Sequence, residues 1–215
     1  MKRVKLISDK DILAERSGEL FRQYGIRSLN LEVIFRKLGI SRKDFYQFFA
    51  DKNEWVDYAI VKLIEHHKKE LQRVMKTGNA VEQALAGRTV IDKLLYKFPV
   101  KLRYELKKYY PAIYDHWTEF KENWLLHVCK KNLAAGIKED FYRQSINIDI
   151  ISVYLLNLVM EKDAGGLLQT KNYPPEAVKR QLTEFELSGL CTTKGRSFLE
   201  DHFSLNTIKV NGNKA

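Results

Sequence analysis

Glycine and proline are sparse in this chain, and they sit at spaced positions, as breaks between helices would. Four prolines and 11 glycines occur among 215 residues. Between them apolar side chains recur every three or four residues, and no segment alternates apolar and polar residues long enough to need a strand. The chain is therefore predicted to be all-α, with a frayed tail over 204–215. The expected helices cover residues 9–24, 31–38, 42–49, 53–76, 80–97, 101–109, 111–135, 148–162, 175–187 and 197–203.

The chain is basic, and its excess charge is uneven. It has 37 Lys and Arg against 27 Asp and Glu, and residues 1–52 hold 12 basic and 7 acidic side chains, which is half of the net +10. A surface that binds a polyanion and an ordinary solvated surface both show such a surplus. The N-terminus lacks the apolar region of a secretory signal, and the longest apolar stretch, 146–160, is too short to span a bilayer. We therefore expect a cytoplasmic protein with no membrane partner.

Residues 30–49 have the pattern of a helix–turn–helix. Asn30 can cap a first short helix, Gly39 turns the chain, and Ser41 can cap a second short helix. Polar side chains lie on the second helix opposite the apolar Phe45 and Phe49; they are Arg42, Lys43, Tyr46 and Gln47. The backbone N–H groups at the start of that helix suit a phosphate. Two packed helices with a glycine turn are common, so spacing alone does not establish DNA binding.

A longer set of residues carries a family resemblance. The set is Leu20-Phe21-Arg22-Gln23-Tyr24-Gly25, Asn30, Ile34, Gly39-Ile40-Ser41, Phe45-Tyr46, Phe49 and Asp51-Lys52. At this spacing it resembles the N-terminal domain of tetracycline-repressor-type (TetR) regulators, and the rest of the chain fits that family in size and helicity. The resemblance implies an all-α subunit. Residues 1–52 would form a three-helix DNA-binding head, and residues 53–215 a helical effector-binding and dimerisation body.

The resemblance also implies individual DNA contacts. The phosphate-contacting positions of the family correspond to Asn30, Ser41, Tyr46, Gln47 and Lys52, and its base-reading positions to Arg42, Lys43 and Asp44. Four residues depart from the pattern. Phe35 stands where the family has a small residue, and Lys43 where Gly or another small residue is usual. Asp44 stands where Ala or Thr is common, and Phe48 where a polar residue or another aromatic is common. Two functions are open for Asp44, a capping interaction with Ser41 or recognition of a cytosine, and a carboxylate beside phosphates repels them.

An aromatic-rich helix indicates where an effector would bind. Helical bundles bind ligands in apolar cavities between helices, and His67 lies on the apolar stripe of 53–76. The predicted pocket, for a largely apolar effector, is formed by His67, Tyr114, Trp117, Phe120 and Trp124. The simpler interpretation is that the rings are core and that His67 is a satisfied core histidine. No metal-ligand spacing and no cofactor motif occurs, so we expect neither a metal nor a cofactor.

The helix expected at 148–162 is apolar nearly all round, which indicates the centre of the fold or a subunit interface. The resemblance places a dimer interface on this helix and on 175–187. The predicted interface residues are Ile151, Leu155, Leu158 and Val159.

These observations favour a ligand-responsive regulator, in its simplest form a repressor, that binds double-stranded operator DNA as a homodimer. In an alternative interpretation the protein has the same fold but does not bind DNA. In that case Phe35 and Asp44 mark a degenerate helix–turn–helix, and the protein is a small-molecule-binding or protein-interaction module. No catalytic motif stands out, so an enzyme is not expected.

Overall fold

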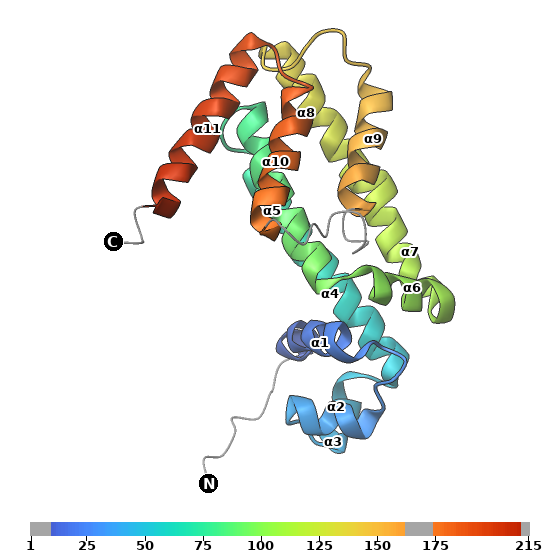
Figure 1. The fold of residues 1–215 in the computed structure, drawn as a ribbon. Coiled ribbons are helices and arrows are strands. Elements are labelled where there is room, and N and C mark those ends of the chain that lie inside the picture. The colour runs from blue at the N-terminus through green and yellow to red at the C-terminus, as the bar shows by residue number, and fades with distance from the viewer. Residues whose placement is uncertain (1–9, 162–173, 212–215) are drawn as a thin grey trace. The chain divides into compact units, whose positions relative to one another are not determined.

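The computed structural model describes residues 10–161 and 174–211, and helices dominate this part of the chain (Figure 1). The elements are α1 (Lys10–Tyr24), α2 (Leu31–Leu38), α3 (Arg42–Phe48), α4 (Lys52–Val74), α5 (Ala80–Lys97), α6 (Val100–Tyr109), α7 (Pro111–Glu119), η1 (Phe120–Leu125), α8 (Leu126–Lys138), α9 (Ile148–Glu161), α10 (Pro175–Ser188) and α11 (Thr193–Asn211). The all-α prediction is confirmed. Among the described residues, no helix is both long enough and apolar enough to cross a membrane.

The largest differences from the expected helices occur in two places, and the other boundaries agree to within two residues. The predicted helix 111–135 contains the π-helical turn η1 and continues to Lys138. Gly136 does not end it, because this glycine is buried inside α8 and a Cβ there would lie 2.0 Å from the Tyr142 ring. The prediction of a frayed tail over 204–215 was wrong for residues 204–211, since α11 continues to Asn211. No glycine or proline interrupts the chain between Arg196 and Asn211.

The chain divides into two compact units. Unit 1 comprises 1–72 and 89–124, and unit 2 comprises 73–88 and 125–215, each over its described part. Both long helices α4 and α5 pass from one unit into the other. The resemblance implies a functional division at residue 52, and the boundaries of the two compact units lie at other residues. The functional division therefore stays a prediction.

Unit 1 has an aromatic core beneath the helix–turn–helix. Helices α1 to α3 fold together at one end of α4 (Figure 1). Phe21, Phe45, Phe49 and Trp55 are all at most 1 % exposed. The Trp55 ring lies 4.8 Å from Phe21 and 6.1 Å from Phe45, between centroids. Large rings of this kind supply most of the apolar area that a small three-helix unit can bury.

Unit 2 packs around Tyr142. Its buried cluster is Ala80, Val81, Leu133, Tyr142, Leu187, Leu190, Cys191 and Leu199. The Tyr142 hydroxyl donates to the Ala80 carbonyl at 3.0 Å. A nearly buried ion pair joins Arg88 on α5 to Glu186 on α10 at 2.6 Å. Burial raises the pKa of the Cys129 and Cys191 thiols to about 11, so both free cysteines are protonated at neutral pH.

Candidate nucleic-acid interface

Buried aromatic side chains fix the position of α3. Phe45 is fully buried and its ring lies 5.4 Å from both Phe35 and Phe49. The Trp55 indole N–H donates to the Ser17 hydroxyl at 2.7 Å, and that hydroxyl donates to the Leu13 carbonyl at 2.6 Å. Phe35, the bulky departure from the family pattern, is only 8 % exposed and is part of this packing. A seven-residue helix is too short to be stable alone, so these contacts set its orientation.

Hydrogen bonds cap both short helices. Asn30 has extended backbone at the start of α2, and its side chain accepts from the Val33 N–H at 2.9 Å. Gly39 ends α2 with a φ of 68°, a conformation that costs glycine no steric energy. The Ser41 hydroxyl accepts from the Asp44 N–H at 3.1 Å and donates to the Asp44 carboxylate at 2.7 Å. The Asp44 carboxylate thus interacts with the Ser41 cap, as the capping function considered for it requires, and recognition of a cytosine by Asp44 stays a prediction.

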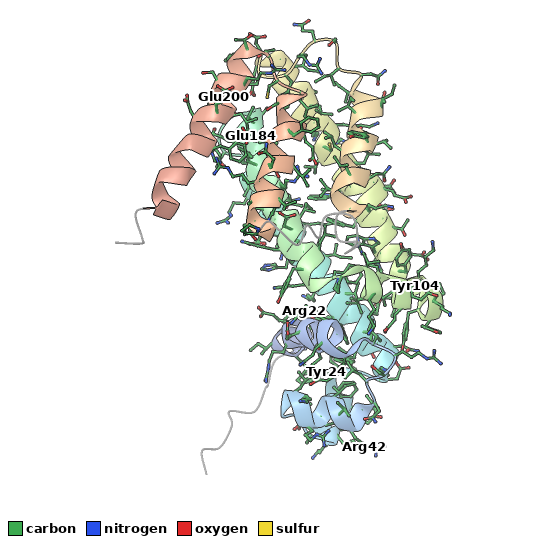
Figure 2. The ribbon with its side chains drawn as sticks, viewed as in Figure 1. Arg22, Tyr24, Arg42, Tyr104, Glu184 and Glu200 are labelled. Atoms are coloured by element: carbon green, nitrogen blue, oxygen red, sulfur yellow. The ribbon has the colours of Figure 1, made fainter. Side chains whose placement is uncertain are left out.

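The opposite face of α3 is polar and open to solvent. Its exposed side chains are Ser41, Arg42, Lys43, Tyr46 and Gln47. Arg42 lies on the edge of the head that faces away from α1 (Figure 2). Its guanidinium stands 5.8 Å from the centroid of the Tyr46 ring. The structure thus brings together all the α3 residues that the resemblance assigned to DNA, with Asp44 half-buried at their base.

Lys52 is engaged with the main chain. Its ammonium donates to the Ile26 carbonyl at 2.7 Å and to the Leu29 carbonyl. Burial lowers the pKa of this ammonium, and the Glu105 carboxylate opposes that shift. An ammonium has three N–H donors, so one remains for a phosphate. The phosphate contact of Lys52 stays a prediction, and its loss would also loosen the turn between α1 and α2.

A residue that the sequence did not single out holds the same turn. Glu105 on α6 accepts from the Ile26 N–H at 2.7 Å and from the Arg27 N–H at 3.1 Å. Gly25 has a φ of 74°, and a Cβ there would lie 2.5 Å from the Glu105 carboxylate. The Arg27 guanidinium donates to the Tyr109 hydroxyl at 2.7 Å. The turn that leads into the helix–turn–helix is therefore fastened to α6.

Comparison with solved structures identifies the fold. No family model matches the sequence, and no curated protein matches it. A TetR-family regulator from Marinobacter aquaeolei VT8 aligns with a TM-score of 0.69 at 15 % identity, covering 91 % of this chain and 97 % of that one. A TetR-family protein from Rhodococcus sp. gives 0.65 at 14 %, covering 85 % and 98 %. AibR, solved with isovaleryl coenzyme A and operator DNA, gives 0.62 at 10 %, covering 82 % and 97 %. The chain has the TetR-family fold.

Within this TetR-family fold, three of the predicted pocket rings lie next to one another, and two of them, Phe120 and Trp124, are stacked. The ring centroids of Trp117 and Phe120 are 5.7 Å apart, and those of Phe120 and Trp124 are 5.6 Å apart at an interplanar angle of 19°. The Lys68 ammonium stands 5.8 and 5.6 Å from the latter two centroids. Phe120 and Trp124 both belong to η1, a π-helical turn that sequence periodicity does not reveal. Such turns often occur at functional sites.

His67 and Tyr114, the other two predicted pocket residues, have different environments. Tyr114 is half-buried. His67 is 1 % exposed, and its Nδ1 donates to the Leu63 carbonyl at 2.8 Å. Burial lowers the pKa of this imidazole, which favours the neutral ring. This geometry is that of the satisfied core histidine that was the simpler interpretation. A role for the five residues in binding an effector stays a prediction.

In unit 2 of the TetR-family fold, α9 and α10 flank an apolar groove of about 660 Å³. The predicted interface residues Ile151 and Leu155 line it and are half-buried against the unit 2 core. Leu158 and Val159 are also half-buried. The most exposed apolar side chains on this face were not predicted individually; they are Ile150 at 67 %, Val153 at 46 %, Tyr154 at 56 % and Phe185 at 76 %. Because α9 is apolar nearly all round, periodicity alone did not decide which of its faces is exposed.

Proposed function

We propose that this protein is a ligand-responsive transcriptional regulator, in its simplest form a repressor, that binds operator DNA as a homodimer. The observation that carries the proposal is the exposed polar face of α3. It is held in place by the buried Phe45 and by the Ser41 cap. The N-terminal residues of a recognition helix reach base edges in the major groove. Arg42 and Lys43 occupy those positions, and Tyr46 and Gln47 suit phosphates.

Selection of DNA by the full chain tests this proposal. Duplexes enriched from a random pool are titrated against scrambled duplexes at two salt concentrations. We expect a clear preference, and we expect Arg42→Ala to cost about 1–3 kcal/mol and to relax that preference. Lys131→Ala, which removes one exposed positive charge from unit 2, is the matched control. If the wild-type protein prefers no duplex after selection, the alternative of a degenerate helix–turn–helix replaces this function.

We propose that the homodimer forms through the face that carries α9 and α10. Single exposed apolar residues are ordinary, but here four of them belong to two helices that flank one groove. A contiguous exposed apolar patch of this kind typically marks a protein interface. A two-fold interface uses the same patch on both subunits, so one face with both a groove and projecting rings fits a second copy. Sedimentation at micromolar concentration measures the assembly.

We also propose that a largely apolar effector acts at the stacked rings of unit 1. The π-helical turn that carries Phe120 and Trp124 leaves a local irregularity in a helix that is otherwise regular. Apolar compounds are screened for those that raise the unfolding temperature and release DNA. Both effects of such a compound are expected to be lost in Trp124→Ala. A compound that still releases DNA from this variant would place the effector elsewhere.

A further inference from the structure

Half of the net charge of the chain resides in one short segment outside the helix–turn–helix. Residues 93–109 contain five lysines and one arginine against a single glutamate, a net +5 of the +10 that the whole chain carries. The helix–turn–helix itself is less basic, because residues 31–52 contain five basic and three acidic side chains. The segment belongs to unit 1, at the end of α5 and along α6.

The fold turns this charge outward. The buried face of α6 is formed by Leu102 and Leu106. Glu105, the one acidic residue of the segment, binds the Ile26 and Arg27 amides. The exposed side chains of the segment are Lys93, Tyr96, Lys97, Val100, Lys101, Tyr104, Lys107, Lys108 and Tyr109, which we call the α6 basic surface. Within the part of the chain that the structure describes, none of its five lysines forms an ion pair with a carboxylate.

Exposed tyrosines alternate with cations on this surface. Tyr96 is 63 % exposed and Tyr104 is 58 % exposed, and Tyr104 projects outward from α6 (Figure 2). The Lys108 ammonium lies 5.7 Å from the Tyr104 centroid and 5.3 Å from that of Tyr109. Lysine ammonium groups and tyrosine hydroxyls are both frequent donors to DNA phosphates. The surface therefore combines positive charges, which attract phosphates over a long range, with hydrogen-bond donors that phosphates accept.

The α6 basic surface is continuous with the head. The Arg27 guanidinium lies 4.5 Å from the centroid of the Tyr109 ring. Arg27 itself belongs to the turn that precedes Asn30, the cap of α2. On the other side, the Arg22 guanidinium of α1 lies 4.8 Å from the Tyr96 centroid. Cations of the head and tyrosines of the α6 basic surface thus contact each other at two points.

We propose that the α6 basic surface is a second DNA contact, which binds backbone phosphates other than those that α3 reaches and reads no bases. The inference rests on the proposed function, because it takes DNA as the polyanion that the head brings close. The surface is of one sign, and its lysine ammonium and tyrosine hydroxyl groups are donors that backbone phosphates accept. The leucines of α6, Leu102 and Leu106, are buried in the fold, so they are not available to insert into a membrane surface.

Salt dependence of DNA binding tests the inference. The variant Lys101→Ala/Lys107→Ala/Lys108→Ala removes three exposed charges from the α6 basic surface. The control Lys76→Ala/Lys131→Ala/Lys138→Ala removes three exposed charges from unit 2. Each lost phosphate contact lowers the slope of log K against log salt by about 0.9. We expect the first variant to lose roughly 2–3 units of slope and the control to keep the wild-type slope.

Sequence specificity gives an independent measurement. The first variant is expected to bind the selected and the scrambled duplex more weakly by the same factor, with an unchanged ratio of affinities, because phosphates carry no sequence information. Equal slopes for the first variant and wild type overturn the inference, and so do equal losses in the two triple variants. Failure of the wild-type protein to bind any DNA would instead overturn the proposed function. Unchanged thermal unfolding of both variants shows that the fold is retained.

Discussion

Helices α3 and α9 each expose a set of side chains that indicates a binding partner. The two sets differ in chemistry, because the first is polar and the second is largely apolar. On α3 the exposed residues are cationic or polar, and the apolar Phe45 is fully buried beneath them. On α9 the exposed apolar residues are Ile150, Val153 and Tyr154, beside the exposed polar Asp149 and Asn157, while Ser152 is buried. A polar partner satisfies the first surface and an apolar partner the second. The exposed surface, more than the core, therefore indicates what each helix binds.

The two helices also depend differently on the rest of the chain. Because the polar side chains of α3 are exposed, we expect their substitution to change the stability of the head little, provided that the buried Phe45 is intact. On α9 the groove-lining Ile151 and Leu155 also pack against the unit 2 core. Substitutions there change assembly and folding together. A test of each surface should therefore use exposed residues, and a test of each anchor should use buried ones.

Removal of the α3 anchor is expected to have the largest effect. Phe45→Ala deletes a fully buried ring that contacts Phe35 and Phe49, and comparable deletions cost about 3–5 kcal/mol of unfolding free energy. Tyr46→Ala is the control, because Tyr46 is the next residue of α3 and its side chain is 42 % exposed. Denaturant unfolding measures both. Similar losses in the two variants would show that α3 is not fixed by its buried face.

A charge on the exposed face of α9 is expected to break the dimer. Tyr154→Asp places a carboxylate in the proposed apolar interface, where an unpaired charge is costly, and we expect dissociation to become at least about 30-fold more favourable, or roughly 2 kcal/mol. Tyr104→Asp introduces the same group at a tyrosine that is equally exposed on α6. It should leave the sedimentation coefficient unchanged. A dimeric Tyr154→Asp protein would move the interface away from this face.

The sequence predicted the elements of the head almost to the residue because local signals determine them. Asn30, Gly39 and Ser41 each perform the capping or turn function that their residue types favour. Phe45 and Phe49 lie one helical turn apart, so their burial followed from periodicity. The polar face of α3 then followed as the remaining side of a short amphipathic helix.

What the sequence did not predict depends on contacts between distant segments. Glu105 meets the Ile26 amide across 79 positions of the chain, and no spacing rule indicates such a pair. The π-helical turn at Phe120 leaves the apolar pattern of its helix nearly intact. The apolar pattern of α9 has no polar stripe, so it did not indicate which side of the helix faces solvent. Ile151 and Leu155 were predicted for the interface, while Ile150 and Tyr154 are more exposed.

Loss of Glu105 is expected to loosen the turn that leads into the helix–turn–helix. Glu105→Ala leaves the Ile26 and Arg27 N–H groups without this acceptor, at a cost of about 1–2 kcal/mol for bonds to a charged group that is half-buried. Amide exchange at residues 26 and 27 should accelerate. Glu19→Ala removes an exposed carboxylate that pairs with Arg22 within α1 and is the matched control. Unchanged exchange at both amides would contradict the fastening of the turn to α6.

The smallest expected effect distinguishes the two functions considered for Asp44. Asp44→Ala removes the acceptor of the Ser41 hydroxyl and a carboxylate from the first turn of α3, where the helix dipole favours negative charge. The Asp44 N–H still donates to Ser41, so we expect a loss of only about 0.5–1 kcal/mol in unfolding free energy. On DNA the same change removes a repulsive charge and frees the Ser41 hydroxyl to donate to a phosphate. Binding should therefore strengthen for every sequence.

Asp44→Asn separates stability from charge. Its amide oxygen still accepts from the Ser41 hydroxyl, so the unfolding free energy should stay near that of wild type, while DNA binding should strengthen as it does for Asp44→Ala. Titrations against duplexes that differ by one base pair provide the decisive comparison. If Asp44 accepts from a cytosine amino group, both variants lose affinity at one base pair only, by about 1–3 kcal/mol, and the capping account of this carboxylate is then incomplete.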